Sequence, residues 1–272
     1  MRYLASILGA WLLLSGIACA GGDHTLKLDG NFTQGGLIKG VATPGSDITV
    51  DGAALRLDRF GRFVFGFGRD APASATLVVR YPDGKTETRV LAIEQRQFDI
   101  QRIDGLPPKM VTPDAATLQR IEQENAMVAA VRKVDTHAAW FWDGFRRPAE
   151  GRVSGVYGSQ RILNGEPRQP HYGLDIAGPR GSPVLAPAAG IVRLASRDFY
   201  YTGGTVIIDH GHGVSSSFLH LDRVEVNVGD KVEAGDLIGA LGATGRATGP
   251  HLDWRVNWFE VRLDPALLLE AR

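Results

Sequence analysis

The stretch Gly249-Pro250-His251-Leu252-Asp253-Trp254-Arg255-Val256 determines the interpretation of the C-terminal half of the chain. A Gly-Pro pair marks a turn, and the alternation that follows is typical of a β-strand, whose successive side chains point to opposite faces. One face of this strand should carry the polar side chains His251, Asp253 and Arg255. The other should carry the apolar side chains Leu252, Trp254 and Val256. A strand anchored in a core by its apolar face can hold polar groups rigidly, as an active site requires.

A second pair of imidazole and carboxylate lies upstream, at His171 and Asp175. Pro170 before them and Gly178-Pro179 after them argue against a helix. In an extended segment, residues four apart face the same way, so both side chains can reach one ion. Catalytic zinc sites use three protein ligands, with imidazole nitrogen and carboxylate oxygen among the preferred donors. Asp253 is the best candidate for the third ligand.

Five of the seven histidines fall between positions 171 and 251. For His220, strand alternation would place its side chain on the same face as Phe218 and present the imidazole at a cleft. The alternative is a surface histidine beside Asp222. His210 and His212 are separated by Gly211 and followed by Gly213, so we expect exposed turn residues and not ligands.

The order and spacing of these motifs resemble the lysostaphin-like zinc peptidases, also called the LytM or M23 family, over about residues 146–269. The resemblance is carried by Val156-Tyr157-Gly158-Ser159-Gln160-Arg161, His171-Tyr172-Gly173-Leu174-Asp175-Ile176, Gly181-Ser182-Pro183-Val184-Leu185-Ala186-Pro187-Ala188-Ala189-Gly190, His220-Leu221, Gly242-Ala243-Thr244-Gly245 and Gly249-Pro250-His251-Leu252. It implies an antiparallel β-sheet peptidase domain with one zinc ion.

By this resemblance, His171 and Asp175 are metal ligands. His220 and His251 are the unliganded histidines that handle protons and stabilise the transition state. The family's third ligand is a histidine two residues after His251, and this chain has Asp253 there. Zinc accepts carboxylate oxygen, so Asp253 can still be a ligand.

An aspartate in this position changes the charge of the site. Zinc with one carboxylate ligand keeps a net charge of +1, whereas zinc with two is formally neutral. A more neutral ion polarises its bound water less. Oxygen-rich coordination also relaxes selectivity toward harder metals such as manganese.

The resemblance, together with a signal-like segment at residues 1–20, predicts an exported zinc metalloendopeptidase that hydrolyses peptide bonds in peptidoglycan. The metal would activate the attacking water, with one of His220 and His251 as general base and the other stabilising the oxyanion. Arg255 would contact an acidic substrate group or form a surface salt bridge. The alternative is a catalytically degenerate relative that binds peptidoglycan or activates another cell-wall hydrolase. Only Asp253 favours this alternative.

Residues 1–20 have the pattern of a signal peptide: Arg2, an apolar run over residues 7–17, and the small-x-small sequence Ala18-Cys19-Ala20. This predicts a periplasmic protein without an integral membrane segment after cleavage. A lipoprotein anchored through Cys19 ranks second, because Gly16 stands where that signal normally has a larger aliphatic residue. Cleavage after Ala20 would remove the only cysteine, so His and carboxylates must hold any metal.

The remaining chain predicts a mainly β protein. Residues 21–98 alternate in short strands with a turn signal roughly every ten residues, which indicates a small Ig-like β-sandwich. Residues 99–145 are a helical linker. Its helix should start at Thr112-Pro113-Asp114 and end near Trp140-Phe141-Trp142, aromatics that pack the helix onto the next domain or line a substrate groove. Residues 146–272 are the peptidase domain. With 30 basic and 30 acidic residues, the chain carries no global field that would attract nucleic acid.

Overall fold

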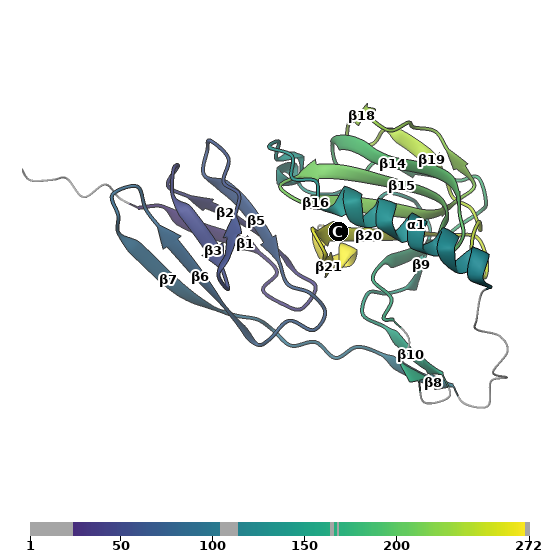
Figure 1. Ribbon diagram of the computed structural model, residues 1–272, viewed down its shortest axis with the longest axis horizontal. Coiled ribbons are helices and arrows are strands. Elements are labelled where there is room, and N and C mark those ends of the chain that lie inside the picture. Colours follow the sequence, from purple (N-terminus) through teal and green to yellow (C-terminus); the bar gives the residue numbers. More distant parts are fainter. Residues whose placement is uncertain (1–23, 104–113, 164–165, 168, 270–272) are drawn as a thin grey trace, which may run out of the picture.

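The computed structural model describes residues 24–103, 114–163, 166–167 and 169–269. The predicted signal peptide and the first two residues of the predicted helix start, Thr112 and Pro113, lie outside these ranges. The described chain is mainly β-strand, as the sequence predicts (Figure 1). No helix within it is long and apolar enough to span a membrane.

The N-terminal strands form two antiparallel sheets around one apolar core, an arrangement that agrees with a small sandwich. Phe63 and Phe65 on one sheet and Leu77 and Val79 on the other are fully buried, because alternate side chains of each strand point inward. The strands are β1 (Leu26–Gly30), β2 (Leu37–Ala42) and β5 (Arg62–Gly66) in one sheet, and β4 (Ala53–Leu55), β3 (Asp47–Val50), β6 (Ser74–Arg80) and β7 (Thr86–Ala92) in the other.

The C-terminal region is built on an eight-stranded antiparallel sheet with the order β18-β14-β15-β16-β20-β12-β9, and β21 added on β20. Its strands are β9 (Arg152–Gly155), β12 (Leu174–Ala177), β14 (Gly190–Phe199), β15 (Gly203–Gly211), β16 (Val214–Leu221), β18 (Lys231–Val232), β20 (His251–Trp258) and β21 (Val261–Leu263). The strands that carry the predicted site, β12 and β20, are neighbours.

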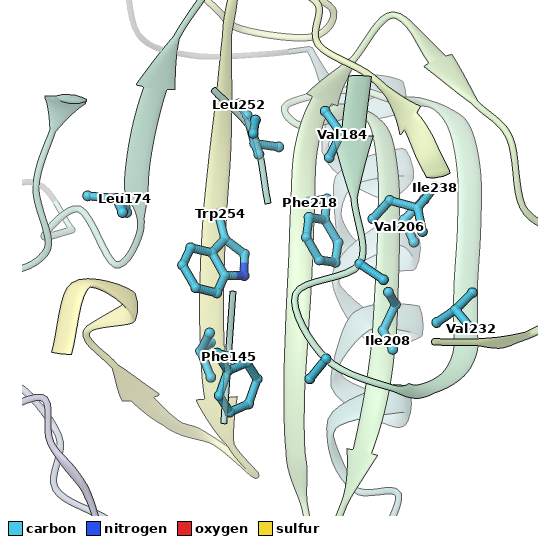
Figure 2. Packing of buried hydrophobic residues seen from close by; sticks show 14 of the residues in the cluster. Phe145, Leu174, Val184, Val206, Ile208, Phe218, Val232, Ile238, Leu252 and Trp254 are labelled. Carbon is cyan, nitrogen blue, oxygen red and sulfur yellow. The ribbon is translucent and has the colours of Figure 1, made fainter. Parts of the chain in front are cut away.

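A three-stranded sheet packs on one face of the large sheet and encloses the main core. It consists of β13 (Pro183–Leu185), β19 (Leu237–Ala240) and β17 (Arg223–Val224). Val184 and Ile238 of this small sheet lie against Val206 and Phe218 of the large one (Figure 2). Trp254 of β20 belongs to the same core and is fully buried. The apolar face of β20 is therefore anchored as the sequence predicts.

Helix α1 (Ala115–Arg132) covers the other face of the large sheet (Figure 1). Val128 and Val131 pack on a small apolar cluster that includes Ile207 of β15. Ile207 pairs with Ser217, which pairs with Arg255, so these three residues share one face of the sheet. The helix and the polar face of β20 thus lie on the same side.

The helix is shorter than predicted. Its N-terminus agrees with the expected start, because Asp114 Oδ1 accepts a hydrogen bond from the Thr117 amide at 2.8 Å. It ends at Arg132, well before the aromatic run, which forms the short 3-10 helix η2 (Trp140–Asp143). Within this run, Phe141 is fully buried in the main core, so its role is packing.

The N-terminal sandwich and the C-terminal region are in direct contact. Leu37 and Val64 of the sandwich are buried in the C-terminal core. Arg96 forms an ion pair of 2.8 Å with Asp264, which caps the short 3-10 helix η3 (Pro265–Leu268). The linker strand β8 (Ile100–Ile103) pairs in parallel with β10 (Gln160–Leu163), which also pairs with β11 (Glu166–Pro167).

Candidate metal centre and neighbouring histidines

Strand register brings the predicted ligands together. Asp175 of β12 pairs directly with Asp253 of β20, and Ala177 pairs with His251. His251 and Asp253 share a face, while Leu252 between them is fully buried on the opposite side. The alternation predicted for β20 is confirmed.

His171, Asp175 and Asp253 offer three donor atoms within 4.8 Å of one another. His171 Nε2 lies 3.0 Å from Asp175 Oδ1 and 3.6 Å from Asp253 Oδ2. The buried Asp175 Oδ1 has no hydrogen-bond partner in suitable geometry among the described residues. Two carboxylates directly opposite on adjacent strands repel each other unless a cation lies near them. One imidazole and two carboxylates that converge in this way fit a divalent cation such as zinc or manganese.

Two glycines make room for the carboxylates. A Cβ added at Gly173 would lie 2.0 Å from Asp253 Oδ1, and one added at Gly155 would lie 2.3 Å from Asp175 Oδ2. Neither glycine has a positive φ, so close approach and not backbone conformation explains the absence of a side chain. The sequence alone does not reveal these two positions, since a glycine that only provides space has no local pattern.

Arg255 binds the third predicted ligand. Its Nη2 donates to Asp253 Oδ2 at 2.6 Å, and its Nε lies 3.0 Å from both carboxylate oxygens. The Asp253 side chain is only 4% exposed, and that of Arg255 is 26% exposed. Of the two roles considered for Arg255, the structure shows a salt bridge, but a half-buried one that involves a predicted ligand.

The neighbouring carboxylates control the protonation of His171. Burial lowers the pKa of this imidazole, but its close contacts with the negatively charged carboxylates of Asp175 and Asp253 outweigh burial and raise the pKa to about 10 in the metal-free protein. Its Nδ1 lies 3.2 Å from the carbonyl oxygen of Val156. Because a carbonyl can only accept, Nδ1 donates and Nε2 is directed to the site.

His220 and His251 lie beside the three donors. Their ring centroids are 4.8 Å apart, and His251 Nε2 is 4.0 Å from Asp175 Oδ1. Each Nδ1 lies 2.8 Å from a backbone carbonyl oxygen, that of Thr244 for His220 and that of Gly249 for His251. Each Nδ1 is therefore the donor, and each neutral ring keeps a free Nε2 lone pair that can accept a proton.

Strand alternation failed at His220. Phe218 pairs with Trp254 and points into the core, yet His220 points to the opposite face. The register between β15 and β16 shifts here, and His220 has a φ of 65°. A bulge of this kind re-aims a side chain. The surface alternative beside Asp222 is also wrong, since the His220 side chain is largely buried and Asp222 pairs with Arg180.

His210 and His212 are buried, not exposed as expected from the turn. His210 Nδ1 contacts the Ala189 carbonyl oxygen at 2.7 Å and its Nε2 contacts Ser216 Oγ at 2.9 Å. Burial lowers the pKa of His210 to about 4, so this side chain is a neutral part of the core. The cluster of three donors contains neither residue.

Comparison with known proteins identifies the region around the site. The model of peptidase family M23 matches residues 169–265, which include all five predicted site residues. This part of the chain belongs to peptidase family M23. The predicted resemblance to the lysostaphin-like M23 peptidases is thereby confirmed for this region.

Curated relatives match the M23 region. The peptidoglycan DD-endopeptidase ShyA of Vibrio cholerae is 42% identical over 87 residues, 32% of this chain and 20% of that protein. The DD-carboxypeptidase/endopeptidase Mpg of Neisseria meningitidis is 42% identical over 89 residues, with the same shares of the two chains. The chain thus spans about a fifth of the length of these relatives.

A solved structure matches the M23 region together with the sandwich and the linker. This crystal structure of a Pseudomonas aeruginosa protein assigned to peptidase M23 has a TM-score of 0.68 and 29% identity, and the match covers 88% of this chain and 96% of that one. The arrangement of Figure 1 is therefore shared beyond the M23 region.

Proposed function

We propose that this chain is an exported, metal-dependent endopeptidase that hydrolyses peptide bonds in peptidoglycan. The observation that carries the proposal is the convergence of His171, Asp175 and Asp253 beside two histidines with free Nε2 atoms. Of the relatives that match this region, ShyA is named a peptidoglycan DD-endopeptidase and Mpg a DD-carboxypeptidase/endopeptidase. The signal-like residues 1–20 agree with a periplasmic location.

Each side chain has a distinct role in this proposal. His171, Asp175 and Asp253 would hold one zinc ion. When bound, the ion supplies Lewis acidity to the scissile carbonyl and the attacking water. Burial lowers the pKa of His220, and its hydrogen bond to Thr244 only partly opposes this, so the ring is neutral at neutral pH and can take a proton as general base. His251, whose Nε2 is 4.0 Å from Asp175 Oδ1, would in its protonated form donate a hydrogen bond to the developing oxyanion, while the proton that His220 takes from the attacking water would pass to the leaving amine.

The degenerate alternative is not favoured, because the cluster of donors and the histidine pair are both complete in the structure. Loss of catalysis would leave no reason to keep two histidine tautomers fixed by backbone carbonyls at the same place.

The test is a digest of purified peptidoglycan with metal-stripped protein, before and after addition of Zn²⁺ or Mn²⁺. We expect muropeptide release only with metal. His171→Ala should lose both metal and activity, and His251→Ala should keep the metal and lose activity. His24→Ala, in the sandwich, is the control and should behave as wild type. A wild type that carries metal and releases no muropeptides would refute the enzyme.

A further inference from the structure

The salt bridge between Arg255 and Asp253 places a fixed positive charge on a proposed metal ligand. The two side chains are two residues apart on the same face of β20, and three contacts of 2.6–3.0 Å join them. Bidentate pairs of this kind are strong and geometrically specific. An arginine guanidinium keeps its proton in proteins, so Arg255 brings a permanent positive charge to Asp253.

Without Arg255, the proposed ligands would carry one more negative charge than the donor set of a common catalytic zinc site. Asp175 and Asp253 face each other across β12 and β20 and would give a donor set of charge −2. A zinc site with two imidazoles and one carboxylate, a common catalytic set, has a charge of −1. The guanidinium of Arg255 restores the value of −1 to the His/Asp/Asp set.

The geometry leaves Asp253 able to serve both partners. A carboxylate has about four lone-pair sites, and Arg255 occupies those on one side. Oδ2, which accepts from Arg255 Nη2, is also the oxygen 3.6 Å from His171 Nε2. A carboxylate oxygen shared with a guanidinium is a weaker donor to a cation than a free one.

Other positive charges surround this pair. Arg262 lies near Arg255, and its guanidinium is 5.6 Å from the ring centre of Tyr172, the residue after His171. Arg132 lies at the end of α1. Burial, together with the charges of Arg262 and Arg255, lowers its pKa to about 9. Its nearest carboxylate is that of Glu260, at 3.9 Å. Arg255 is the member of this group that touches a ligand.

We infer that Arg255 is a charge-compensating residue of the metal centre, which cancels the second carboxylate and thereby sets the affinity of the site for a divalent cation. This inference rests on the proposed metal-dependent function. It assigns Arg255 to the metal and not to the substrate. It also implies that Asp253 and Arg255 form one functional unit, so replacement of either residue alone changes the affinity for the cation.

The test is the Zn²⁺ affinity of full-length protein, measured by competition with a chromophoric chelator. Coulomb's law at an effective dielectric of about 20 predicts that loss of a unit charge a few ångströms from the ion changes affinity by about tenfold or more. Arg255→Gln should therefore bind Zn²⁺ about tenfold more tightly than wild type. Arg255→Lys keeps the charge and should stay within about threefold of wild type.

The Asp253→His background provides an independent test. Asp253→His removes a negative charge and keeps Arg255, so it should bind Zn²⁺ about tenfold more weakly, although histidine is a good zinc ligand. Asp253→His with Arg255→Gln returns the donor set to −1 and should recover at least wild-type affinity. This comparison decides the matter even if Arg255→Gln alone fails to fold, a point that circular dichroism and thermal unfolding will establish.

The inference is overturned if removal of Arg255 leaves Zn²⁺ affinity unchanged or weakens it in a folded protein. If no folded variant binds Zn²⁺, both the inference and the metal-dependent function fail. If affinities change as expected but wild type with Zn²⁺ releases no muropeptides, only the proposed function fails. If wild type is active and the affinities do not depend on Arg255, only the inference fails.

Discussion

Gly173→Ala should disable the metal centre while the rest of the fold persists. The added Cβ would lie 2.0 Å from Asp253 Oδ1, and ordinary contact begins at 3.4 Å, so the pair must separate by about 1.4 Å (3.4 − 2.0). Asp253 cannot simply rotate away, because it is buried and joined to Arg255 by three short contacts. The new Cβ would also lie 3.0 Å from Arg255 Cγ, which restricts the pair further.

A shift of this size is large for a metal ligand. Zinc-oxygen distances are about 2.0–2.2 Å with a tolerance of about 0.2 Å, so a displaced Asp253 would leave the coordination sphere. We expect Zn²⁺ affinity to fall by at least about tenfold to hundredfold, the range for disturbed supporting residues. Overpacking should also lower the free energy of unfolding by about 1–3 kcal/mol.

Chelator competition measures the affinity of Gly173→Ala, and chemical denaturation measures its stability. Gly68→Ala is the matched control, because its nearest contact would be Val261 Cγ1 at an ordinary 3.8 Å. Wild-type Zn²⁺ affinity in folded Gly173→Ala would refute the assignment of Asp253 as a ligand that depends on this space.

Buried ionisable side chains should also control proton release and stability in measurable ways. Because the pKa of His171 is raised to about 10, binding of Zn²⁺ at pH 7 should release about one proton, detectable by calorimetry in buffers of different ionisation enthalpy. In the metal-free protein, the ion pair of this imidazole should stabilise the fold fully below pH 6.5, the ordinary pKa of histidine. That contribution should be lost as the pH rises through about 10. His210, whose pKa is lowered to about 4, should make thermal stability fall as the pH drops from 6.5 to 4, and His210→Gln should flatten this dependence. Arg96→Ala leaves the buried carboxylate of Asp264 without its ion pair and should cost about 1–3 kcal/mol in chemical denaturation, whereas Arg80→Ala, whose pair is exposed, should cost nothing measurable.

The sequence predicted the parts of the site that depend on regular periodicity. Alternation placed His251 and Asp253 on one face of β20, and spacing placed His171 with Asp175, because an extended chain repeats every two residues. The resemblance supplied the order in which these pieces meet. The mainly β fold was predictable for the same reason, since a turn signal every ten residues allows few other architectures.

Alternation could not predict His220 or Gly173. The orientation of His220 depends on a bulge between β15 and β16, which is a property of two paired strands and not of either sequence alone. The space at Gly173 is filled by a side chain eighty positions away. The burial of His210 had the same origin: the turn beside it was predicted, but the core that covers it comes from other segments, including the ring of Phe145.

The aspartate at position 253 argues neither for nor against catalysis when it is considered alone. A carboxylate opposite Asp175 would be destabilising on a bare sheet, since like charges on paired residues repel. Arg255 offsets the charge of Asp253 from within the same strand, and the glycine at position 173 leaves space for the resulting pair. Both features act on the same carboxylate, and neither would be needed if the site had been abandoned. The Asp175 carboxylate lies 3.0 Å from His171 Nε2, yet its buried Oδ1 has no hydrogen bond of suitable geometry in the described chain. A divalent cation at that point would satisfy both residues at once, and this is why we expect the site to be occupied in the working protein.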